Sequence, residues 1–126
     1  MENIKEDIIR EYVKAYNSFD IEAMLKNLHS EVEFINISNG AIDLRLRGID
    51  QFRVQAEKAK SIFSSRQQEI TSFSGQQDSV EVEINYRGTF AMDLADQIRK
   101  GDNIELKGKS IFKFKDQQII HITDMS

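Results

Sequence analysis

Cysteine and proline are both absent from this chain of 126 residues. Without cysteine there is no disulfide framework, thiol nucleophile or cysteine metal site. Without proline, no cis-proline turn can shape the fold. The first residues contain no apolar stretch like that of a signal peptide, and no apolar run approaches the length of a membrane span. We therefore expect a cytoplasmic protein with no membrane partner.

Clustered positive charge is also missing. The net charge is −4, and lysine and arginine are mixed with aspartate and glutamate along the whole chain. Because nucleic-acid-binding proteins usually carry a basic patch, we expect no nucleic-acid partner. The length and the ordinary hydrophobic content predict a single domain over residues 1–126 with one core.

The clearest pattern lies in the last quarter, Ile104–Met125, which we interpret as two strands joined by a tight turn near residues 115–118. Even positions of the first strand are apolar or small and most odd positions are charged. Side chains alternate between the two faces of a strand, so one face is apolar and the other polar. Gly108 and Ser110 leave a gap on the apolar face, which indicates either a pocket floor or a close helix contact.

The remaining elements follow from hydrophobic spacing and turn residues. Helices are predicted at residues 3–18, 20–28 and 50–63, and strands at 31–37, 42–47, 67–74, 80–92, 104–115 and from 119 onward. Helices separated from a run of hairpin-linked strands are typical of the α+β class. We expect three helices packed on a curved, mostly antiparallel sheet of about six strands.

Four segments carry a resemblance to a known family: Tyr12–Asp20, Arg47–Asp50, Tyr86–Phe90 and Gly108–Asp116. In order and spacing they resemble the nuclear transport factor 2-like superfamily, and most closely its SnoaL-like and ketosteroid-isomerase-like branches. The resemblance covers nearly the whole chain. It implies a cone-shaped, cystatin-like roll with a deep apolar pocket between sheet and helices, and often a homodimer.

The resemblance also allows particular reactions to be compared with the residues present. Ketosteroid isomerases use a tyrosine and a carboxylic acid as an oxyanion hole, plus a carboxylate base. Tyr12 falls at the tyrosine position, but the base position falls on Asn36 and the acid position on Ser110. An amide cannot act as this base, so that chemistry is not expected. Epoxide-hydrolase relatives need an arginine and an aspartate where this chain has Gly108 and Ser110, so that reaction is not expected either.

SnoaL-type polyketide cyclases are implied to use an acidic residue near the final strand as acid and base. The nearest match is Asp124, with His121 close by, and both are candidate catalytic residues. A simple two-residue turn pairs Asp124 with Lys109 on the charged face and places His121 on the Phe112 face. A bulge would instead turn Asp124 towards the pocket. Under the simple turn, His121 is either a satisfied core histidine or the pocket's one titratable base.

The inner faces of the helices and strands predict an apolar pocket for a flat, mainly apolar small molecule. Its candidate ligand-binding residues are Tyr12, Tyr16, Asn36, Phe52, Phe90, Met92, Ser110 and Phe112. Their phenol, amide and hydroxyl groups can orient a carbonyl or hydroxyl of the ligand. We expect no cofactor, because no phosphate loop or nucleophile elbow is present, and no metal site, because the two histidines lie far apart.

Two functional classes remain open at this point. One is a cyclase-like or isomerase-like enzyme acting on a carbonyl compound. The other is a non-catalytic module that binds an apolar ligand or dimerises, which the scarcity of acids on the inner face favours. Ile111 lies among lysines on the polar face, with Ile122 beside it under the simple turn and Ile120 near. An apolar patch of this kind indicates a partner, so we expect a homodimer through the outer sheet face.

Overall fold

A computed structural model describes residues 3–94 and 97–126. In this part of the chain the helices are α1 (Ile4–Asn17), α2 (Ile21–Lys26) and α3 (Ile49–Ile62). The strands are β1 (Leu28–Ser38), β2 (Ala41–Arg47), β3 (Phe63–Gly75), β4 (Ser79–Phe90), β5 (Asn103–Lys115) and β6 (Gln118–Met125). They form one six-stranded sheet in the order β2-β1-β6-β5-β4-β3. Only the β1–β6 pair among these neighbours is parallel, so the predicted α+β fold is confirmed.

Local capping explains where the helices begin. The side chain of Asn3 accepts a hydrogen bond from the backbone N–H of Glu6, and that of Asp20 accepts one from Ala23 at 3.1 Å. Both bonds satisfy donors that the first turn of a helix leaves unpaired. Asp20 is therefore the N-cap of α2, at the start of the helix predicted over residues 20–28. Gly48 precedes α3 with φ of 83°, a conformation that suits glycine, and Asp50 lies in the first turn.

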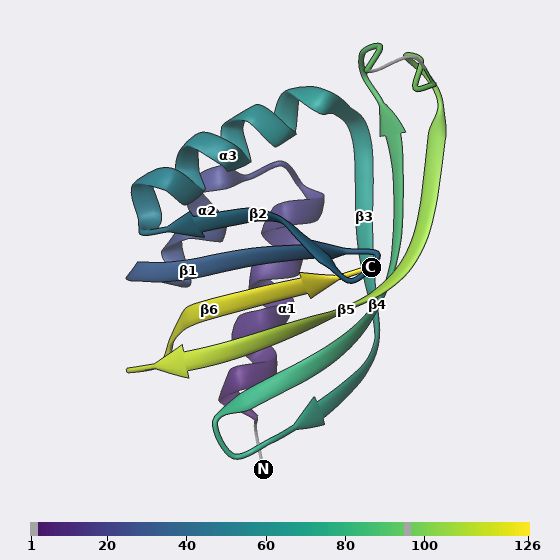
Figure 1. The fold of residues 1–126 in the computed structure, drawn as a ribbon. Coiled ribbons are helices and arrows are strands. Elements are labelled where there is room, and N and C mark those ends of the chain that lie inside the picture. Colours follow the sequence, from purple (N-terminus) through teal and green to yellow (C-terminus); the bar gives the residue numbers. More distant parts are fainter. Residues whose placement is uncertain (1–2, 95–96) are drawn as a thin grey trace.

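The sheet bends around its helices. Figure 1 shows β3 and β4 standing steeply against the direction of β1, β2 and β6, with α1 and α2 behind the sheet and α3 along its upper edge. The core lies inside this bend. Its fully buried side chains include Ile9 of α1, Phe112 of β5, and Ile119 and Ile122 of β6. The predicted faces of β5 are correct for Phe112 and for the exposed lysines, although Phe114 is half-buried rather than fully buried.

A bulge in the β5–β6 hairpin decides which way β6 faces. The turn residues Asp116 and Gln117 both have positive φ, 53° and 62°, as a two-residue type I′ turn requires. The register then shifts, because Lys113 pairs with His121 and Phe114 pairs with Ile119. Ile120 is therefore the extra residue of a bulge. Of the two alternatives left open by the sequence, the bulged hairpin is the one found.

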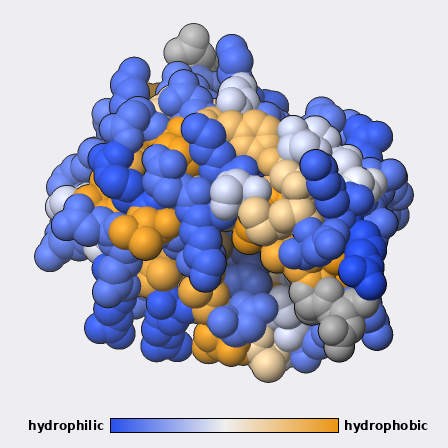
Figure 2. Space-filling model, turned by 90° about the horizontal axis from the view of Figure 1, so that it is seen from above, coloured by the Kyte–Doolittle hydropathy of each residue, from blue (hydrophilic) through white to orange (hydrophobic). Residues whose placement is uncertain are grey.

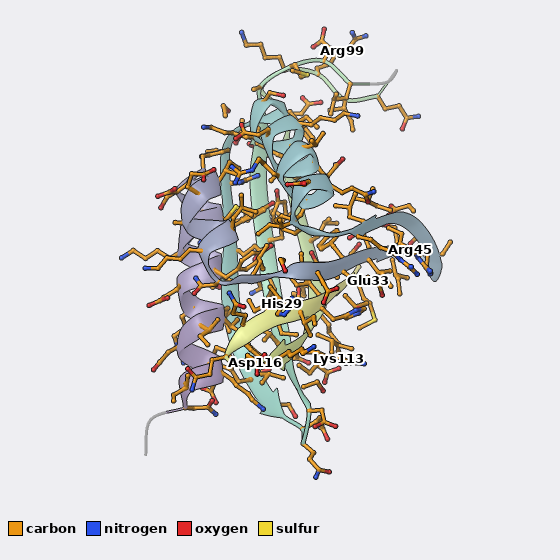
Figure 3. All side chains as sticks on the ribbon, turned by 90° about the vertical axis from the view of Figure 1, so that its left-hand side faces the viewer. His29, Glu33, Arg45, Arg99, Lys113 and Asp116 are labelled. Atoms are coloured by element: carbon orange, nitrogen blue, oxygen red, sulfur yellow. The ribbon has the colours of Figure 1, made fainter. Side chains whose placement is uncertain are left out.

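The bulge also changes the outer face of the sheet. Ile122 is 1% exposed in the core, so the prediction that it lies beside Ile111 on the outer face is wrong. Ile111 instead lies opposite Thr123, which pairs on its other side with Ile35. Figure 3 shows charged side chains such as Glu33 and Lys113 on the side of the sheet that faces away from α1. Ile35 and Ile111 are thus the isoleucines near the centre of a largely charged face.

The homodimer through this face stays a prediction. Wild-type protein should be a dimer at micromolar concentration, and Ile111→Lys should make it a monomer, because a lysine there would be desolvated without a partner. Light scattering measures the mass directly. Glu105→Lys, a substitution on β5 away from Ile35 and Ile111, is the control and should leave the dimer intact. A wild-type monomer whose mass Ile111→Lys does not change would contradict the prediction.

Elsewhere the surface is mainly hydrophilic. Figure 2 shows polar residues over most of the face seen from above, with apolar residues visible between them. The large apolar side chains that are exposed come from different parts of the chain: Ile4, Ile42, Val54, Met92 and Leu106. Within residues 3–94 and 97–126, no helix has the length and hydropathy to cross a membrane.

Candidate functional site

A cavity of about 280 Å³ lies between the end of α1 and the inner face of the sheet. Five of the six strands contribute to its wall, β2 being the exception. The polar side chains on this wall include Tyr16, Asn36, Ser38, Gln68, Tyr86, Ser110 and Asp124. The apolar part of the lining includes Ile84, Leu106 and Gly108. The cavity is therefore a mixed pocket with polar groups from several elements directed at one space.

Asp124 is the carboxylate of this cavity. The bulge at Ile120 places Asp124 opposite Ser110 on β5 and beside Asn36 on β1, in one row across three strands. The Ser110 hydroxyl donates a hydrogen bond to Asp124 Oδ1 at 2.6 Å. Burial raises the pKa of Asp124 to about 6, although the bond from Ser110 acts in the opposite direction. A carboxyl group with this pKa can both accept and return a proton near neutral pH.

A pair of phenols forms another part of the wall. The Tyr16 hydroxyl donates to the Tyr86 hydroxyl at 3.1 Å. Burial is the main reason that the pKa of each phenol is raised, so both stay protonated. Asn17 holds Tyr16 in place, because its side chain exchanges two hydrogen bonds with the backbone of Gln68 at 2.7 and 3.1 Å. The end of α1 is thereby fixed to β3, and the phenol pair is a preformed hydrogen-bonding group.

Asn36 is one of the residues that line the cavity. Its amide nitrogen donates to Asp43 at 2.8 Å and to Ser38 at 3.3 Å, so the β1–β2 hairpin holds it. The bond from Asn36, together with one that the Ser38 hydroxyl donates at 3.0 Å, lowers the pKa of Asp43, which is exposed. These bonds therefore hold the Asn36 side chain in place, and its neutral amide cannot act as a base.

Two glycines on the inner faces of β4 and β5, Gly88 and Gly108, differ in their surroundings. Gly108 lines the cavity, and a Cβ built there would lie 2.5 Å from the carbonyl oxygen of Met125. Glycine is thus required where the end of β6 approaches β5 closely. Beside Gly88, by contrast, the ring of Phe63 fills the space, since a Cβ would lie 3.0 Å from it. Gly88 adds no volume to the cavity.

The structure brings together Tyr16, Asn36, Ser110 and Asp124 of the predicted site residues. Five of the predicted ligand-binding residues do not line the cavity. Tyr12 packs against Phe52 and Phe112 in the core, with ring centroids 6.5 and 6.0 Å apart. Phe90 stacks on Phe63 at 5.0 Å, and Met92 lies beyond the end of β4 with 39% of its surface exposed. These five residues shape the core and the surface instead.

The expectation that His121 shares the Phe112 face is wrong. Because of the bulge, His121 lies opposite Lys113 on the outer side of the sheet. Its Nε2 is 2.6 Å from the Thr123 hydroxyl, and its Nδ1 is 3.4 Å from the carboxylate of Glu33. Desolvation lowers the pKa of His121, although Glu33 opposes the shift. His121 is thus separated from the cavity by the sheet.

The residues near the cavity that the sequence analysis missed include Arg66, Gln68 and Tyr86. Tyr86 stands on the same alternating face as Ile84, so its position was available from the pattern. Arg66 and Gln68 also alternate with exposed neighbours, but β3 begins at Phe63, earlier than the predicted start at residue 67. The sequence of β3 is mostly polar, so it lacks the apolar alternation that predicts which side chains point inward. For metal binding, residues 3–94 and 97–126 contain no cluster of three potential ligands.

Comparison with known proteins places these observations in context. Residues 9–122 match the family model described as SnoaL-like domain. The chain is similar to a proposed polyketide cyclase from Xanthomonas campestris pv. campestris, with 21% identity, a TM-score of 0.83, and coverage of 98% of this chain and 90% of that one. It is also similar to TerC, co-crystallised with polyporic acid, at 16% identity, a TM-score of 0.77, and coverage of 97% and 90%.

A third solved structure is a cystatin-fold protein from Novosphingobium aromaticivorans, with 11% identity, a TM-score of 0.75 and full coverage of both chains. At such low identities the likeness to solved structures shows the fold alone. No curated protein sequence matches the chain.

Proposed function

The chain belongs to the SnoaL-like domain family, and we propose that its cavity binds a small, flat carbonyl compound on which Asp124 moves a proton. The reaction is polyketide-cyclase-like or isomerase-like. The observation that carries the proposal is the Asp124 carboxyl group on the cavity wall, bonded to Ser110 and with a pKa of about 6. Perturbed carboxyl groups in a cavity are typical of catalytic acids and bases.

The chemistry follows from the groups on the wall. The Asp124 carboxylate takes a proton from a carbon next to the ligand's carbonyl group. The C–H electron pair forms a C=C bond, and the carbonyl π electrons move to the oxygen, which becomes an enolate. In an isomerisation, Asp124 returns the proton to another carbon of the enolate. In a cyclisation, the enolate carbon attacks a second carbonyl carbon, and Asp124 returns the proton to the new alkoxide.

The phenol pair stabilises the charge that develops on the oxygen. Tyr16 and Tyr86 share one hydrogen bond, so one of their two phenolic protons is free for the ligand. A preformed donor aimed at a developing negative charge lowers the barrier, because it needs no reorganisation during the step. The cavity volume of about 280 Å³ is at the small end for ligand sites, which favours a compact ligand.

The pH dependence of exchange tests this proposal. Incubating a panel of 1,3-dicarbonyl compounds in D₂O, we expect wild-type protein to catalyse exchange of their C–H protons, measured by NMR. The rate should rise with pH and level off above about 6, because the base is the ionised form of Asp124. His121→Ala is the matched control and should keep both the rate and the profile, since His121 lies on the far side of the sheet.

A non-catalytic binding module would give a different result. Panel compounds would then bind, in a titration followed by calorimetry, and no exchange or turnover would be seen with any of them. Loss of the exchange activity or of its pH dependence in His121→Ala would also contradict the assignment of Asp124 as the base.

A further inference from the structure

Arg66 is a buried cation for which the described residues supply no counter-ion. The residue is 5% exposed, and its Nε donates a hydrogen bond to the backbone oxygen of Tyr16 at 2.9 Å. Its Nη2 is fully buried and has no hydrogen-bond partner. Within residues 3–94 and 97–126, no carboxylate forms an ion pair with Arg66. A guanidinium is always charged, and leaving such a charge desolvated and unpaired is costly.

The cation lies directly behind the phenol pair of the cavity. Its Cζ is 3.7 Å from the ring centroid of Tyr16 and 4.5 Å from that of Phe19, so the guanidinium contacts both aromatic rings. Tyr16 in turn bonds to Tyr86, and both phenols line the cavity. The charge of Arg66 opposes the effect of burial on the pKa of each phenol. Arg66 therefore acts on the cavity through Tyr16 and Tyr86.

We infer that Arg66 makes the cavity selective for ligands that place an ionised oxygen, such as a phenolate or an enolate, against the Tyr16–Tyr86 pair. The ligand's oxygen is then the counter-ion that the described residues lack. The inference rests on the proposed function in one respect, that the ligand occupies this cavity. It goes further by specifying that the bound ligand is negatively charged. Arg66 is a positioning residue here, since it strengthens the phenols as hydrogen-bond donors and does not itself touch the ligand.

The other charged groups on the wall do not provide this selectivity. Asp124 carries negative charge above its pKa of about 6 and so disfavours an anion nearby. Lys109 is exposed and lies 3.9 Å from the carboxylate of Glu81, which partly balances it. Solvent also screens an exposed lysine far more than a buried arginine. A preference for anions therefore points to Arg66.

Two probes of similar size, one anionic and one neutral, test the inference. At pH 8, 4-nitrophenol is ionised, whereas 4-nitroaniline is neutral. We expect wild-type protein to bind the phenolate about tenfold or more tightly than the aniline, and to lower the pKa of bound 4-nitrophenol by about one unit, as a nearby opposite charge does. Calorimetry gives the affinities, and the absorbance of the phenolate gives its pKa when bound.

Matched variants distinguish the effect of the Arg66 charge from any structural role of its side chain. Arg66→Gln should remove the preference for the phenolate, and Arg66→Lys should keep part of it. Arg87→Gln removes the same charge from an exposed position on β4 and should change neither probe. Because the pKa of the bound probe is measured in wild-type protein, the test still holds if Arg66→Gln does not fold.

Equal binding of the two probes, binding of neither, or a preference that folded Arg66→Gln retains would overturn the inference. These measurements require no turnover. The charge preference and the proton transfer by Asp124 can therefore fail independently of each other.

Discussion

Asp124→Asn should abolish proton transfer and also make the protein more stable above pH 6. An asparagine keeps the size of the side chain and can still accept the bond from Ser110, but it cannot take a proton from carbon. General acid–base groups typically contribute ~10²–10⁴-fold to a rate, so exchange of 1,3-dicarbonyl protons should fall by about that factor. The NMR exchange assay measures this loss, with His121→Ala as the control that retains activity.

The gain in stability follows from the raised pKa of Asp124. That pKa is about 6 in the folded protein and ~3.9 in an unfolded chain. Between these values the folded state binds the proton more tightly, so the free energy of unfolding falls as pH rises from about 4 to about 6 and stays lower above that. A neutral asparagine side chain carries no such penalty. The variant should be more stable than wild type at pH 7 by up to ~3 kcal/mol, an upper value because water reaches the carboxyl group through the cavity.

Urea unfolding at pH 4 and pH 7 measures this difference. The two proteins should differ at pH 7 and converge towards pH 4, where Asp124 is protonated in the folded protein and about half protonated in the unfolded chain, so that little of the penalty remains. A variant that keeps exchange activity, or that shows no gain at pH 7, would contradict the assignment. Ser110→Ala offers a second check. It removes the hydrogen bond that lowers the Asp124 pKa, so the midpoint of the rate profile should move above pH 6.

Phe112→Ala should have the largest effect on stability among single substitutions in the sheet. The side chain is 1% exposed at the centre of the core, and its ring meets that of Tyr12 edge-on at 6.0 Å. Truncation removes the buried ring and leaves a cavity between α1 and β5. The expected cost is ~3–5 kcal/mol in the free energy of unfolding. Chemical unfolding followed by circular dichroism measures it.

Neighbouring positions on β5 are the controls. Phe114 is half-buried, so Phe114→Ala should cost less than Phe112→Ala. Lys113 is exposed on the other face, and Lys113→Ala should stay within ~0.5 kcal/mol of wild type. If Phe112→Ala were as mild as Lys113→Ala, the assignment of the two faces would have to be abandoned.

Sequence patterns were sufficient where a feature depends on neighbouring residues. The apolar stripe of α1, the Asp20 cap and the alternation of β5 all appear in the structure where they were expected. Long-range pairing carries no such local signal. The parallel contact of β1 with β6 joins segments about ninety residues apart, and nothing in either segment alone indicates it.

The candidate site was only partly predictable for a related reason. The orientation of Asp124 and His121 depends on one extra residue, Ile120, and both registers of the hairpin fit the sequence. Alternation along a strand shows which face of the sheet a side chain lies on. It does not show whether that part of the face lines the cavity or packs in the core. Ser110 and Phe112 share one face of β5, yet Ser110 lines the cavity and Phe112 lies in the core.

The position of β6 has a consequence for how the protein is made. β6 lies between β1 and β5 near the centre of the sheet, yet it is the final strand of these residues in order of synthesis. Until it leaves the ribosome, the β1–β2 hairpin and the β3–β4–β5 meander have no strand to join them, and both expose unpaired edges. The complete sheet can therefore form only after β6 is available, and folding should be slow for a domain of this size, since such distant contacts carry a high entropic cost. Asp124 would reach its place only in that last step.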